Sequence, residues 1–451
     1  MSINIRREGA ATGTVFHRGT SQYTGGRKVM RTGLERISQL ARENPDRKQQ
    51  TLMHCVNPET LRGVHERQDK NKAYGVDRVT KCDYEANLEE NLKDLVRRMK
   101  QFSYRPQPAR RTYIPKDDSD KMRPLGIPAY EDKLVQGAMA DVLTAIYEPK
   151  FYDFSYGFRA NRDCHQAIEV LYRELWRRTN WVVDADIKGF FDNVDHEWMM
   201  KFLEHDIEDK NFLRYVKRFL KAGIMEAEEY IDVDSGVPQG GLISPVLANV
   251  YLHYSIDMWF AKVIAKRAQG KVAMIRYADD VVYCFEHEEE ARGFYEALKE
   301  RLAKFSLELS EEKSKIIQFG IKAGKDAGRF DFLGFTHLMA KSRKGKPCIK
   351  RVTSQKKLKA KRQKVKKWLK EQMHAPIEIL VKKLNAKLRG HYNYYGIIGN
   401  YDAMKGFREY VLDRLKAVLA RRGTNKDMTE EEFRHILKCY PVALPRIAHQ
   451  V

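Results

Sequence analysis

Apolar and polar residues follow one another along the first three quarters of the chain in patterns that predict both strands and helices. Residues 181–187 (Trp-Val-Val-Asp-Ala-Asp-Ile) are typical of a strand that enters a loop, and Asp195 is placed to cap the helix that follows. The apolar runs 272–276 and 281–285 predict two more strands, and the acidic turn 277–280 (Tyr-Ala-Asp-Asp) between them predicts a hairpin. This mixture of elements indicates an α+β domain.

Helical spacing alone governs the last quarter of the chain. A helix over 288–305 closes the α+β part, and beyond about residue 340 apolar residues recur only at helical intervals. Two such helices are marked by Ile377, Leu380, Val381, Leu384 and Leu388, and by Met404, Phe407, Val411, Leu415 and Val418. With the basic segment 354–372 they predict a three-helix unit. Thr429 to Glu432 has the pattern of a capping box and predicts a short last helix.

The net charge of the chain limits the kinds of molecule that we expect it to bind. The chain has 451 residues, and 83 Lys and Arg against 61 Asp and Glu give a formal net charge of +22. Such an excess indicates a polyanion, either nucleic acid or an anionic membrane surface. No apolar run reaches the ~18 residues of a membrane span, and the N-terminus has no signal-peptide core, so we expect a cytosolic protein with no membrane partner. The segment 341–370 holds fifteen Lys or Arg and no acid, which suggests a domain boundary near 340–355.

The six cysteines are scattered along the chain, with no Cys-x-x-Cys pair and no Cys/His cluster at zinc spacing. We therefore expect free thiols in a reducing compartment and no structural zinc.

Two groups of carboxylates suggest a metal site. Asp279 and Asp280 lie between apolar strands, where paired negative charges are costly unless a cation compensates them. Asp184 and Asp186 share one face of the 181–187 strand because side chains alternate along a strand, and Asp192 follows in the loop. Oxygen ligands of this kind suit Mg²⁺, and two such ions support nucleotidyl transfer.

These residues stand in an order that resembles the motifs of reverse transcriptases, and more narrowly of the reverse transcriptase/maturases encoded by bacterial group II introns. The motifs are Asp186 with Phe191 five residues on, Pro238-Gln-Gly-Gly241, Tyr277-Ala-Asp-Asp280, Ser310-Glu-Glu-Lys313 and Phe332-Leu-Gly-Phe335. Supporting runs are Ile114-Pro-Lys116, Arg123-Pro-Leu-Gly-Ile-Pro128, Ser155-Tyr-Gly-Phe-Arg159 and Leu388-Arg-Gly-His-Tyr-Asn-Tyr-Tyr395. The resemblance extends from about residue 30 to the end.

The resemblance implies a right-hand polymerase with fingers, a palm built on an antiparallel sheet, and an all-helical thumb. Residues 1–105 would form an N-terminal extension and the start of the fingers, and 106–340 the fingers and palm. Residues 341–421 would form the thumb, called domain X in these maturases, and 422–451 a short DNA-binding remnant without the endonuclease domain. The implied location is the bacterial cytosol, in association with the nucleoid.

The resemblance also assigns roles to particular residues. Asp186, Asp279 and Asp280 would be the catalytic carboxylates that bind two Mg²⁺ ions, with Mn²⁺ as a possible substitute, while Asp184 and Asp192 are left as structural. The expected nucleotide-binding residues are Lys116, Arg123, Phe191, Gln239 and Lys313, of which Phe191 would pack under the sugar and exclude a 2′-hydroxyl. The expected template or RNA contacts are Arg159, Lys356, Lys357, Lys361, Arg362, Lys366, Lys367, Arg389 and Tyr394.

The implied activity is RNA-directed synthesis of DNA from dNTPs at a primer 3′ end, with the intron RNA as template and partner and a DNA primer or target. Assistance of splicing and retrohoming would be a second role. Without an endonuclease, the expected primer is a nascent strand at a replication fork or an existing 3′ end.

Alternatives stay open at this point. Taken alone, an Asp-Asp pair is usually a solvated turn, a basic pair on a hairpin is usually solvated, and Tyr392, Tyr394 and Tyr395 fit a thumb core as well as they fit stacking on RNA. The rival functions are an RNA-binding splicing cofactor without polymerase activity, a domesticated reverse transcriptase in DNA repair or phage defence, and an RNA-dependent RNA polymerase, which Phe191 disfavours.

Overall fold

The structure is a computed structural model, and it describes residues 26–115, 122–227, 229–237, 239–342, 344–422 and 428–450. Two residues of the motifs quoted above, Lys116 and Pro238, lie outside the described residues.

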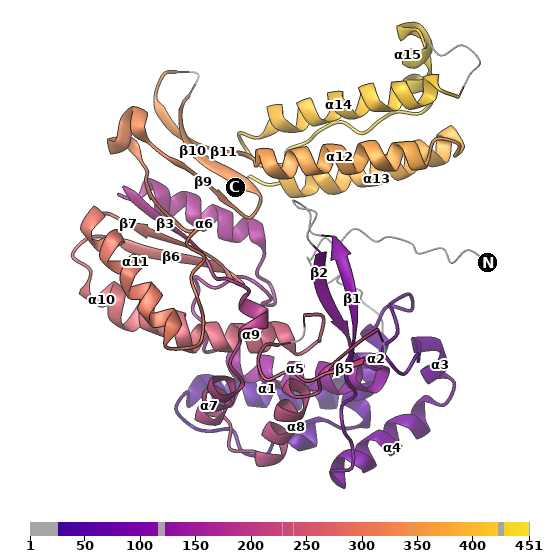
Figure 1. Cartoon of the computed structure of the whole chain (residues 1–451), viewed down its shortest axis with the longest axis vertical. Coiled ribbons are helices and arrows are strands. Elements are labelled where there is room, and N and C mark those ends of the chain that lie inside the picture. The colour runs from indigo at the N-terminus through magenta and orange to yellow at the C-terminus, as the bar shows by residue number, and fades with distance from the viewer. Residues whose placement is uncertain are drawn as a thin grey trace.

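A four-stranded antiparallel sheet carries the acidic strand ends, and we call it the carboxylate sheet (Figure 1). Its strand order is β6-β7-β3-β8, with β6 at Val272–Tyr277, β7 at Asp280–Phe285, β3 at Trp181–Asp186 and β8 at Lys315–Gln318. The strands β6 and β7 pair from Val272 opposite Phe285 to Tyr277 opposite Asp280. The structure therefore confirms the predicted hairpin with its acidic tip.

Both faces of the carboxylate sheet are covered, which explains its near-continuous apolar runs. Alternate residues along the strands, among them Val182, Ile275 and Val282, form one apolar cluster with α6 (Cys164–Trp176). The residues between them, such as Val183 and Tyr283, join a larger core with α11 (Glu288–Ala303). The sheet is thus held rigidly between two layers, and its strand ends form a firm base for the carboxylates.

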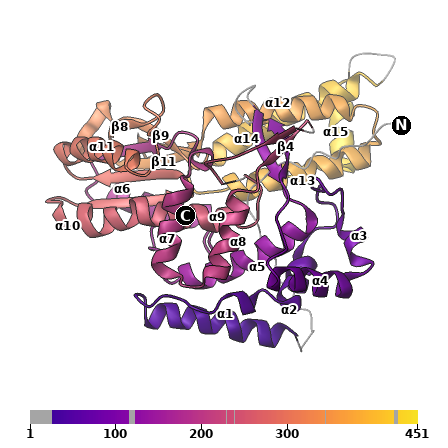
Figure 2. The same ribbon diagram turned by 60° about the horizontal axis from the view of Figure 1, so that its bottom comes forward.

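The N-terminal part consists of helices and of two strands that belong to a second four-stranded sheet, which β4 and β5 complete from further along the chain. The helices are α1 (Gly26–Glu43), α2 (Pro58–Arg67), α3 (Lys81–Glu85), α4 (Leu88–Lys100) and α5 (Tyr130–Tyr147). The sheet has the order β2-β1-β4-β5, with β1 at Ala109–Pro115, β2 at Met122–Ile127, β4 at Ile224–Glu226 and β5 at Glu229–Ile231. Helix α5 is buried along most of its length, and α1 packs along it at the outer edge of the molecule (Figure 2).

The remaining helices of the α+β part connect the two sheets. They are α7 (His196–Asp206), α8 (Lys210–Leu220), α9 (Ser244–Leu252) and the short α10 (Ala265–Arg267). Asp195 caps α7 as predicted, since its side chain accepts a hydrogen bond from the Trp198 amide at 2.9 Å. Two π-helical turns, His253–Asp257 and Phe260–Ile264, continue the path of α9.

A third sheet of strand order β11-β10-β9 links the α+β part to the C-terminal helices. Its strands are β9 (Arg329–Phe332), β10 (Phe335–Lys341) and β11 (Pro347–Thr353). The predicted helical unit over 341–421 therefore needs correction, because residues 347–353 form a strand and the first helix begins at Gln355. The many lysines concealed a period-two pattern, in which Ile349, Arg351 and Thr353 are buried while Lys350 is exposed.

The C-terminal helices form a separate block at one end of the molecule (Figure 1). They are α12 (Gln355–Glu371), α13 (Ile377–Tyr395), α14 (Tyr401–Ala420) and α15 (Glu430–Cys439). The predicted apolar stripes meet in one core, and Thr429 makes the predicted capping box with Glu432. Phe433 and Val442 are buried in the same core, so the described part of the expected 422–451 remnant packs with these helices.

The six cysteines are free thiols, as predicted. Among the helices that the structure describes, none is both long and apolar enough to cross a lipid bilayer.

Candidate functional site

Strand register brings the three predicted catalytic carboxylates to one edge of the carboxylate sheet. Asp186 is the last residue of β3 and lies directly opposite Asp280, the first residue of β7. Asp279 occupies the turn before β7, next to Asp280. The loop that carries the Ser-Glu-Glu-Lys motif fixes the backbone of Asp186. The Asp186 amide donates a hydrogen bond to Ser314 Oγ at 3.0 Å, and the Asp186 carbonyl accepts one from the Ser310 amide at 2.8 Å.

The carboxylates interact strongly because they are buried close together. Burial, together with the charges of Asp279 and Asp186, raises the pKa of Asp280 to about 7. Burial and the Asp186 charge also raise the pKa of Asp279. Asp184 lines the same edge, and burial with the charges of Asp280 and Asp186 raises its pKa to about 7. Each ionised carboxylate at this edge therefore raises the pKa of its neighbours.

Positive side chains from three parts of the chain face these carboxylates. The Lys313 ammonium lies 2.8 Å from Asp186 Oδ2. The charges of Lys357, on α12, and of Lys313 favour ionised Asp280 and so oppose the rise of its pKa, and the Arg123 guanidinium of β2 acts in the same way on Asp279. The β1–β2 hairpin, the loop before β8 and the C-terminal helices thus contribute to one electrostatic centre.

The ligand chemistry of this centre fits a divalent cation. Asp186, Asp279 and Asp280 offer the hard carboxylate oxygens that Mg²⁺ prefers. The raised pKa values of Asp279 and Asp280 show negative charge that a bound cation would relieve. In the described part of the chain no three Asp, Glu, His or Cys side chains already converge on one ion position. Lys313 stands beside Asp186 as the cation that balances it in this structure.

A pocket of about 180 Å³ opens on the same edge of the sheet. Four carboxylates and Lys313 line it together with the turn at Phe332 and Leu333; the carboxylates are Asp184, Asp186, Asp280 and Asp331. Asp331 has other partners, since it accepts hydrogen bonds from Thr336 Oγ1 at 2.5 Å and Ser354 Oγ at 2.6 Å.

The acidic turn is held in place by two residues behind it. Arg276 is fully buried and donates hydrogen bonds to both carboxylate oxygens of Asp257 and, at 3.1 Å, to the Ala278 carbonyl. Gly157 packs on the turn from the other side, where a Cβ atom would lie 2.2 Å from the Ala278 nitrogen. Ala278 itself has a φ of +57°, which costs roughly 1 to 3 kcal/mol and persists because these neighbours fix it.

The structure describes four of the five predicted nucleotide-binding residues, of which Lys313 lies beside Asp186. Phe191 is half-buried beside Phe190, with the ring centroids 5.3 Å apart. The Gln239 carbonyl accepts a hydrogen bond from the Gly126 amide of β2 at 2.7 Å, which joins Gln239 to the β1–β2 hairpin. Arg123 is exposed on β2, opposite Ile114 of β1. Lys116 lies outside the described residues.

Most of the predicted RNA-binding residues lie on the surface of the C-terminal helices. Four are exposed and three are half-buried; the exposed ones are Lys356, Lys366, Lys367 and Arg389, and the half-buried ones are Lys357, Lys361 and Arg362. The Arg362 guanidinium lies over the Tyr410 ring, 5.2 Å from its centroid. Exposed basic side chains are thus present on both α12 and α13.

Two of the predicted template contacts have partners within the protein. The Arg159 side chain is buried, donates to both oxygens of Glu148 and donates to the carbonyls of Tyr152 and Ser155. The Tyr394 hydroxyl donates to the Leu333 carbonyl at 2.9 Å, and its ring stacks on Phe335. Both side chains satisfy the protein's own polar or apolar groups.

Sequence reasoning missed the supports of the acidic turn. Arg276 was visible as a lone charged residue in an apolar strand, a signal that it needs a buried partner. Its partner Asp257 lies in a different element, 19 residues away, and no spacing rule connects the two. Gly157 belongs to the Ser-Tyr-Gly-Phe-Arg run, and nothing in that run indicates that it packs against the acidic turn.

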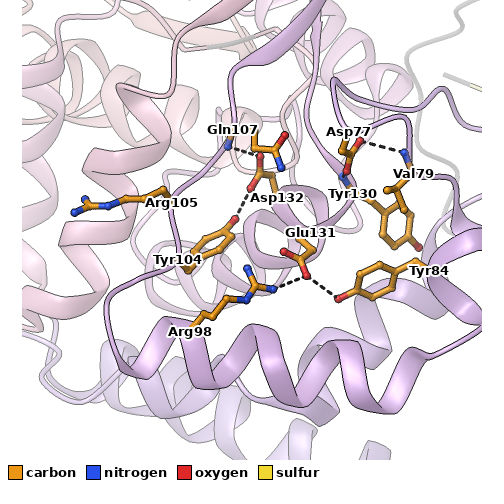
Figure 3. Close-up of a pocket in the computed structure, with 10 residues that line it drawn as sticks. All are labelled: Asp77, Val79, Tyr84, Arg98, Tyr104, Arg105, Gln107, Tyr130, Glu131 and Asp132. Carbon is orange, nitrogen blue, oxygen red and sulfur yellow. Dashed lines mark hydrogen bonds and ion pairs between the residues drawn. The ribbon is translucent and has the colours of Figure 1, made fainter.

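A larger pocket of about 260 Å³ lies away from this site, between α4, α5 and the residues that precede β1 (Figure 3). Its carboxylates already have partners. Arg98 Nη2 donates to Glu131 Oε1 at 2.7 Å, and the Gln107 amide and the Tyr104 hydroxyl donate to Asp132. Burial raises the pKa of Asp132 to about 7. This pocket is therefore best understood as polar packing between α4 and α5.

Comparison with known proteins identifies the family. Residues 114–337 match the family described as reverse transcriptase (RNA-dependent DNA polymerase), and residues 358–439 match the maturase-specific domain of group II introns. The chain belongs to this reverse transcriptase family and carries the maturase-specific domain, so both the resemblance and the right-hand polymerase fold class are confirmed.

Individual relatives agree with this assignment. The group II intron-encoded protein LtrA of Lactococcus lactis subsp. cremoris is 41% identical over 221 residues, which cover 49% of this chain and 37% of that protein. Protein YkfC of Escherichia coli K12 is 34% identical over 308 residues, which cover 60% of this chain and 77% of that protein. The chain thus matches little more than a third of the Lactococcus protein.

Among solved structures, telomerase from Candida albicans in complex with a fragment of telomeric RNA aligns with a TM-score of 0.44 and 11% identity, over 80% of this chain and 66% of that chain. This likeness is too distant to support any conclusion about function.

Proposed function

We propose that the protein is the RNA-directed DNA polymerase of a group II intron, which adds dNTPs to a primer 3′ end and binds its intron RNA to assist splicing and retrohoming. The observation that carries the proposal is the register of β3 and β7, which sets Asp186 opposite Asp280 with Asp279 in the adjoining turn. Membership of the reverse transcriptase family supports the same reaction.

Asp186, Asp279 and Asp280 would hold two Mg²⁺ ions. When bound, the ions would favour attack of the primer 3′-oxygen on the α-phosphorus and stabilise the leaving pyrophosphate. Arg123 would bind the triphosphate through its planar guanidinium, and Lys313 would exchange its contact with Asp186 for phosphate oxygens. Lys116, beyond the end of β1, is proposed to join Arg123.

Phe191 and Gln239 would define the position of the incoming nucleotide. The Phe191 ring would pack under the sugar and leave no room for a 2′-hydroxyl, so that dNTPs are preferred to NTPs. Gln239 lies where the backbone of the palm meets β2, and it would contact the nascent base pair.

The basic surface of α12 and α13 would bind the template and the intron RNA. Lys356, Lys366 and Lys367 of α12 and Arg389 of α13 are exposed, and repulsion among so many positive charges falls when a polyanion binds. The match of residues 358–439 to a maturase-specific domain supports a separate role in splicing. DNA contacts from the C-terminal segment and a location in the bacterial cytosol belong to the same proposal.

The test is primer extension on an RNA template with Mg²⁺ and either dNTPs or NTPs, in which wild type is compared with Asp279→Ala. We expect dNTP-dependent extension by wild type and its loss in the variant. If wild type extends with neither substrate, or the variant extends equally well, the proposal is wrong. A protein that binds and splices intron RNA without extending a primer would instead be a splicing cofactor.

A further inference from the structure

Phe158 is a large apolar side chain that the fold presents to solvent. It is 50% exposed, and its φ is +60°, in the left-handed region that residues with a side chain seldom adopt. Such a conformation persists only when the surrounding structure fixes it, and residues of this kind gather at ligand sites and clamps. An exposed phenylalanine held in an unfavourable conformation therefore calls for a role outside the core.

Both neighbours of Phe158 anchor its backbone close to the carboxylates. Gly157 packs against the turn that carries Asp279, and its carbonyl accepts a hydrogen bond from Asn249 Nδ2 at 2.8 Å. On the other side, the buried Arg159 guanidinium is fixed by Glu148. The backbone position of Phe158 is therefore fixed beside the acidic turn by the contacts of both neighbours.

The ring of Phe158 meets the ring of Phe191. Their centroids lie 6.4 Å apart with an interplanar angle of 77°, an edge-to-face contact. Phe190 makes a second edge-to-face contact with Phe191, at 5.3 Å and 72°. Phe190 is buried in the core, whereas Phe158 is exposed, so the Phe191 ring is held between the core and the open side of the site.

The backbone of Phe191 is fixed independently of both rings. Its carbonyl accepts a hydrogen bond from the Val237 amide at 2.8 Å. The freedom that remains to Phe191 is rotation of its side chain, and the contact on the open side is the one that Phe158 supplies. Removal of the Phe158 ring would let the Phe191 ring turn toward solvent and widen the space under the sugar.

We propose that Phe158 is a positioning residue for sugar discrimination, which acts by holding the Phe191 ring in the orientation that excludes a 2′-hydroxyl. The inference rests on the proposed polymerase function and deepens it. It explains together the exposure of Phe158, its left-handed backbone and its contact with Phe191.

The experiment measures kcat/KM for single-nucleotide addition of a dNTP and of the matching NTP, with the full chain, Mg²⁺ and an RNA template. We expect Phe191→Ala to relax selectivity for dNTP by about 100-fold, and Phe158→Ala by about tenfold, through a gain in kcat/KM for NTP while KM for dNTP changes little. Phe158→Tyr keeps the ring edge and should retain selectivity. The double variant should be no less selective than Phe191→Ala alone, since both act through one ring.

Phe102 provides a matched control. It follows the end of α4 and also has a left-handed backbone, with φ +58°, and it is 37% exposed. Its ring, however, contacts the guanidinium of Arg214 on α8, which lies 4.2 Å from the ring centroid. Phe102→Ala should leave selectivity unchanged. Phe158→Gly, which removes the ring and relieves the backbone, should behave as Phe158→Ala does and separates loss of the ring from loss of folding.

The outcomes distinguish the two levels of the proposal. If Phe191→Ala relaxes selectivity and Phe158→Ala does not, the positioning role is wrong and the polymerase function stands. The role is equally wrong if Phe158→Ala and Phe158→Gly lower kcat/KM for dNTP and NTP by the same factor. If wild type extends with neither substrate, the polymerase function and the role of Phe158 fail together.

Discussion

Arg276 and Asp257 form a fully buried, bidentate ion pair behind the acidic turn. The same guanidinium donates to Asn249 Oδ1 at 3.0 Å and to the Ala278 carbonyl at 3.1 Å. Because Ala278 immediately precedes Asp279, one side chain connects the core to the position of a proposed metal ligand. The charge of Asp257 fixes the guanidinium, and the guanidinium fixes the turn.

Arg276→Lys should separate two contributions of the guanidinium, its ion pair with Asp257 and its hydrogen bond to the Ala278 carbonyl. A lysine keeps the positive charge but cannot make the bidentate contact and also reach Ala278. We expect kcat of primer extension to fall about 10- to 100-fold with little change in KM, and the free energy of unfolding to fall by about 2 kcal/mol. Chemical denaturation and single-nucleotide kinetics measure the two effects.

The double variant Arg276→Met/Asp257→Leu is the control for stability. Replacing both partners of a buried ion pair with apolar residues is often neutral for stability, so this protein should recover most of the lost unfolding free energy without recovering kcat. Recovery of full activity would mean that Arg276 serves only the core.

Gly157→Ala should displace the acidic turn without altering any carboxylate. The added Cβ would lie 2.2 Å from the Ala278 nitrogen, and the contact is with backbone, which cannot rotate away. We expect primer extension to fall about 100-fold, since a shift of the order of 1 Å at a reacting centre has an effect of that size. Gly293→Ala on α11 is the matched control, because a Cβ there meets nothing within 4 Å and should stabilise the helix by about 0.5–1 kcal/mol. Equal activity in the two variants would contradict the close contact.

Charge reversal on α12 should weaken RNA binding and its dependence on salt. Lys366→Glu/Lys367→Glu removes two exposed positive charges, and each lost phosphate contact lowers the slope of log K against log salt by about one. Lys210→Glu/Lys217→Glu, on exposed positions of α8, makes the same change in net charge outside the proposed surface. Binding titrations at several salt concentrations should show a reduced slope in the first variant and a nearly unchanged slope in the second.

The carboxylate hairpin was predictable because two local signals agreed. Period-two alternation put Asp184 and Asp186 on one face, and paired apolar runs put Asp279 and Asp280 at a turn. Register then aligned Asp186 with Asp280, as the motif order implied. Local pattern and family order were therefore sufficient to place these carboxylates at neighbouring strand ends.

Roles that depend on distant partners were not predictable in the same way. Arg159 follows a Gly-Phe pair in a motif, and nothing in that segment indicates that Glu148 buries it. Tyr394 fits RNA stacking by composition, but the turn at Leu333 occupies its hydroxyl. Strand β11 was concealed because a run of lysines resembles a charged helix until its alternate residues are seen to be buried.

The pH dependence of the free energy of unfolding should show the titration of Asp132, whose side chain is buried at the start of α5. Its pKa is raised from an ordinary value near 4 to about 7, with burial as the main cause, so between these values the folded protein binds a proton that the unfolded chain has released. Stability from this group is therefore fully present at low pH and is lost as pH rises toward 7.

The side chain introduced by Asp132→Asn cannot ionise, and its amide group can still form hydrogen bonds with the Tyr104 hydroxyl and the Gln107 amide. Relative to wild type, its free energy of unfolding should improve by on the order of 2 kcal/mol between pH 5 and pH 8. Denaturant titrations at the two pH values measure that change. Asp153→Asn is the control, since the Asp153 side chain is 97% exposed and should show the same difference from wild type at both pH values. If the free energies of unfolding of Asp132→Asn and of wild type change in parallel from pH 5 to pH 8, Asp132 is ionised throughout that range, which its burial against Tyr104 argues against.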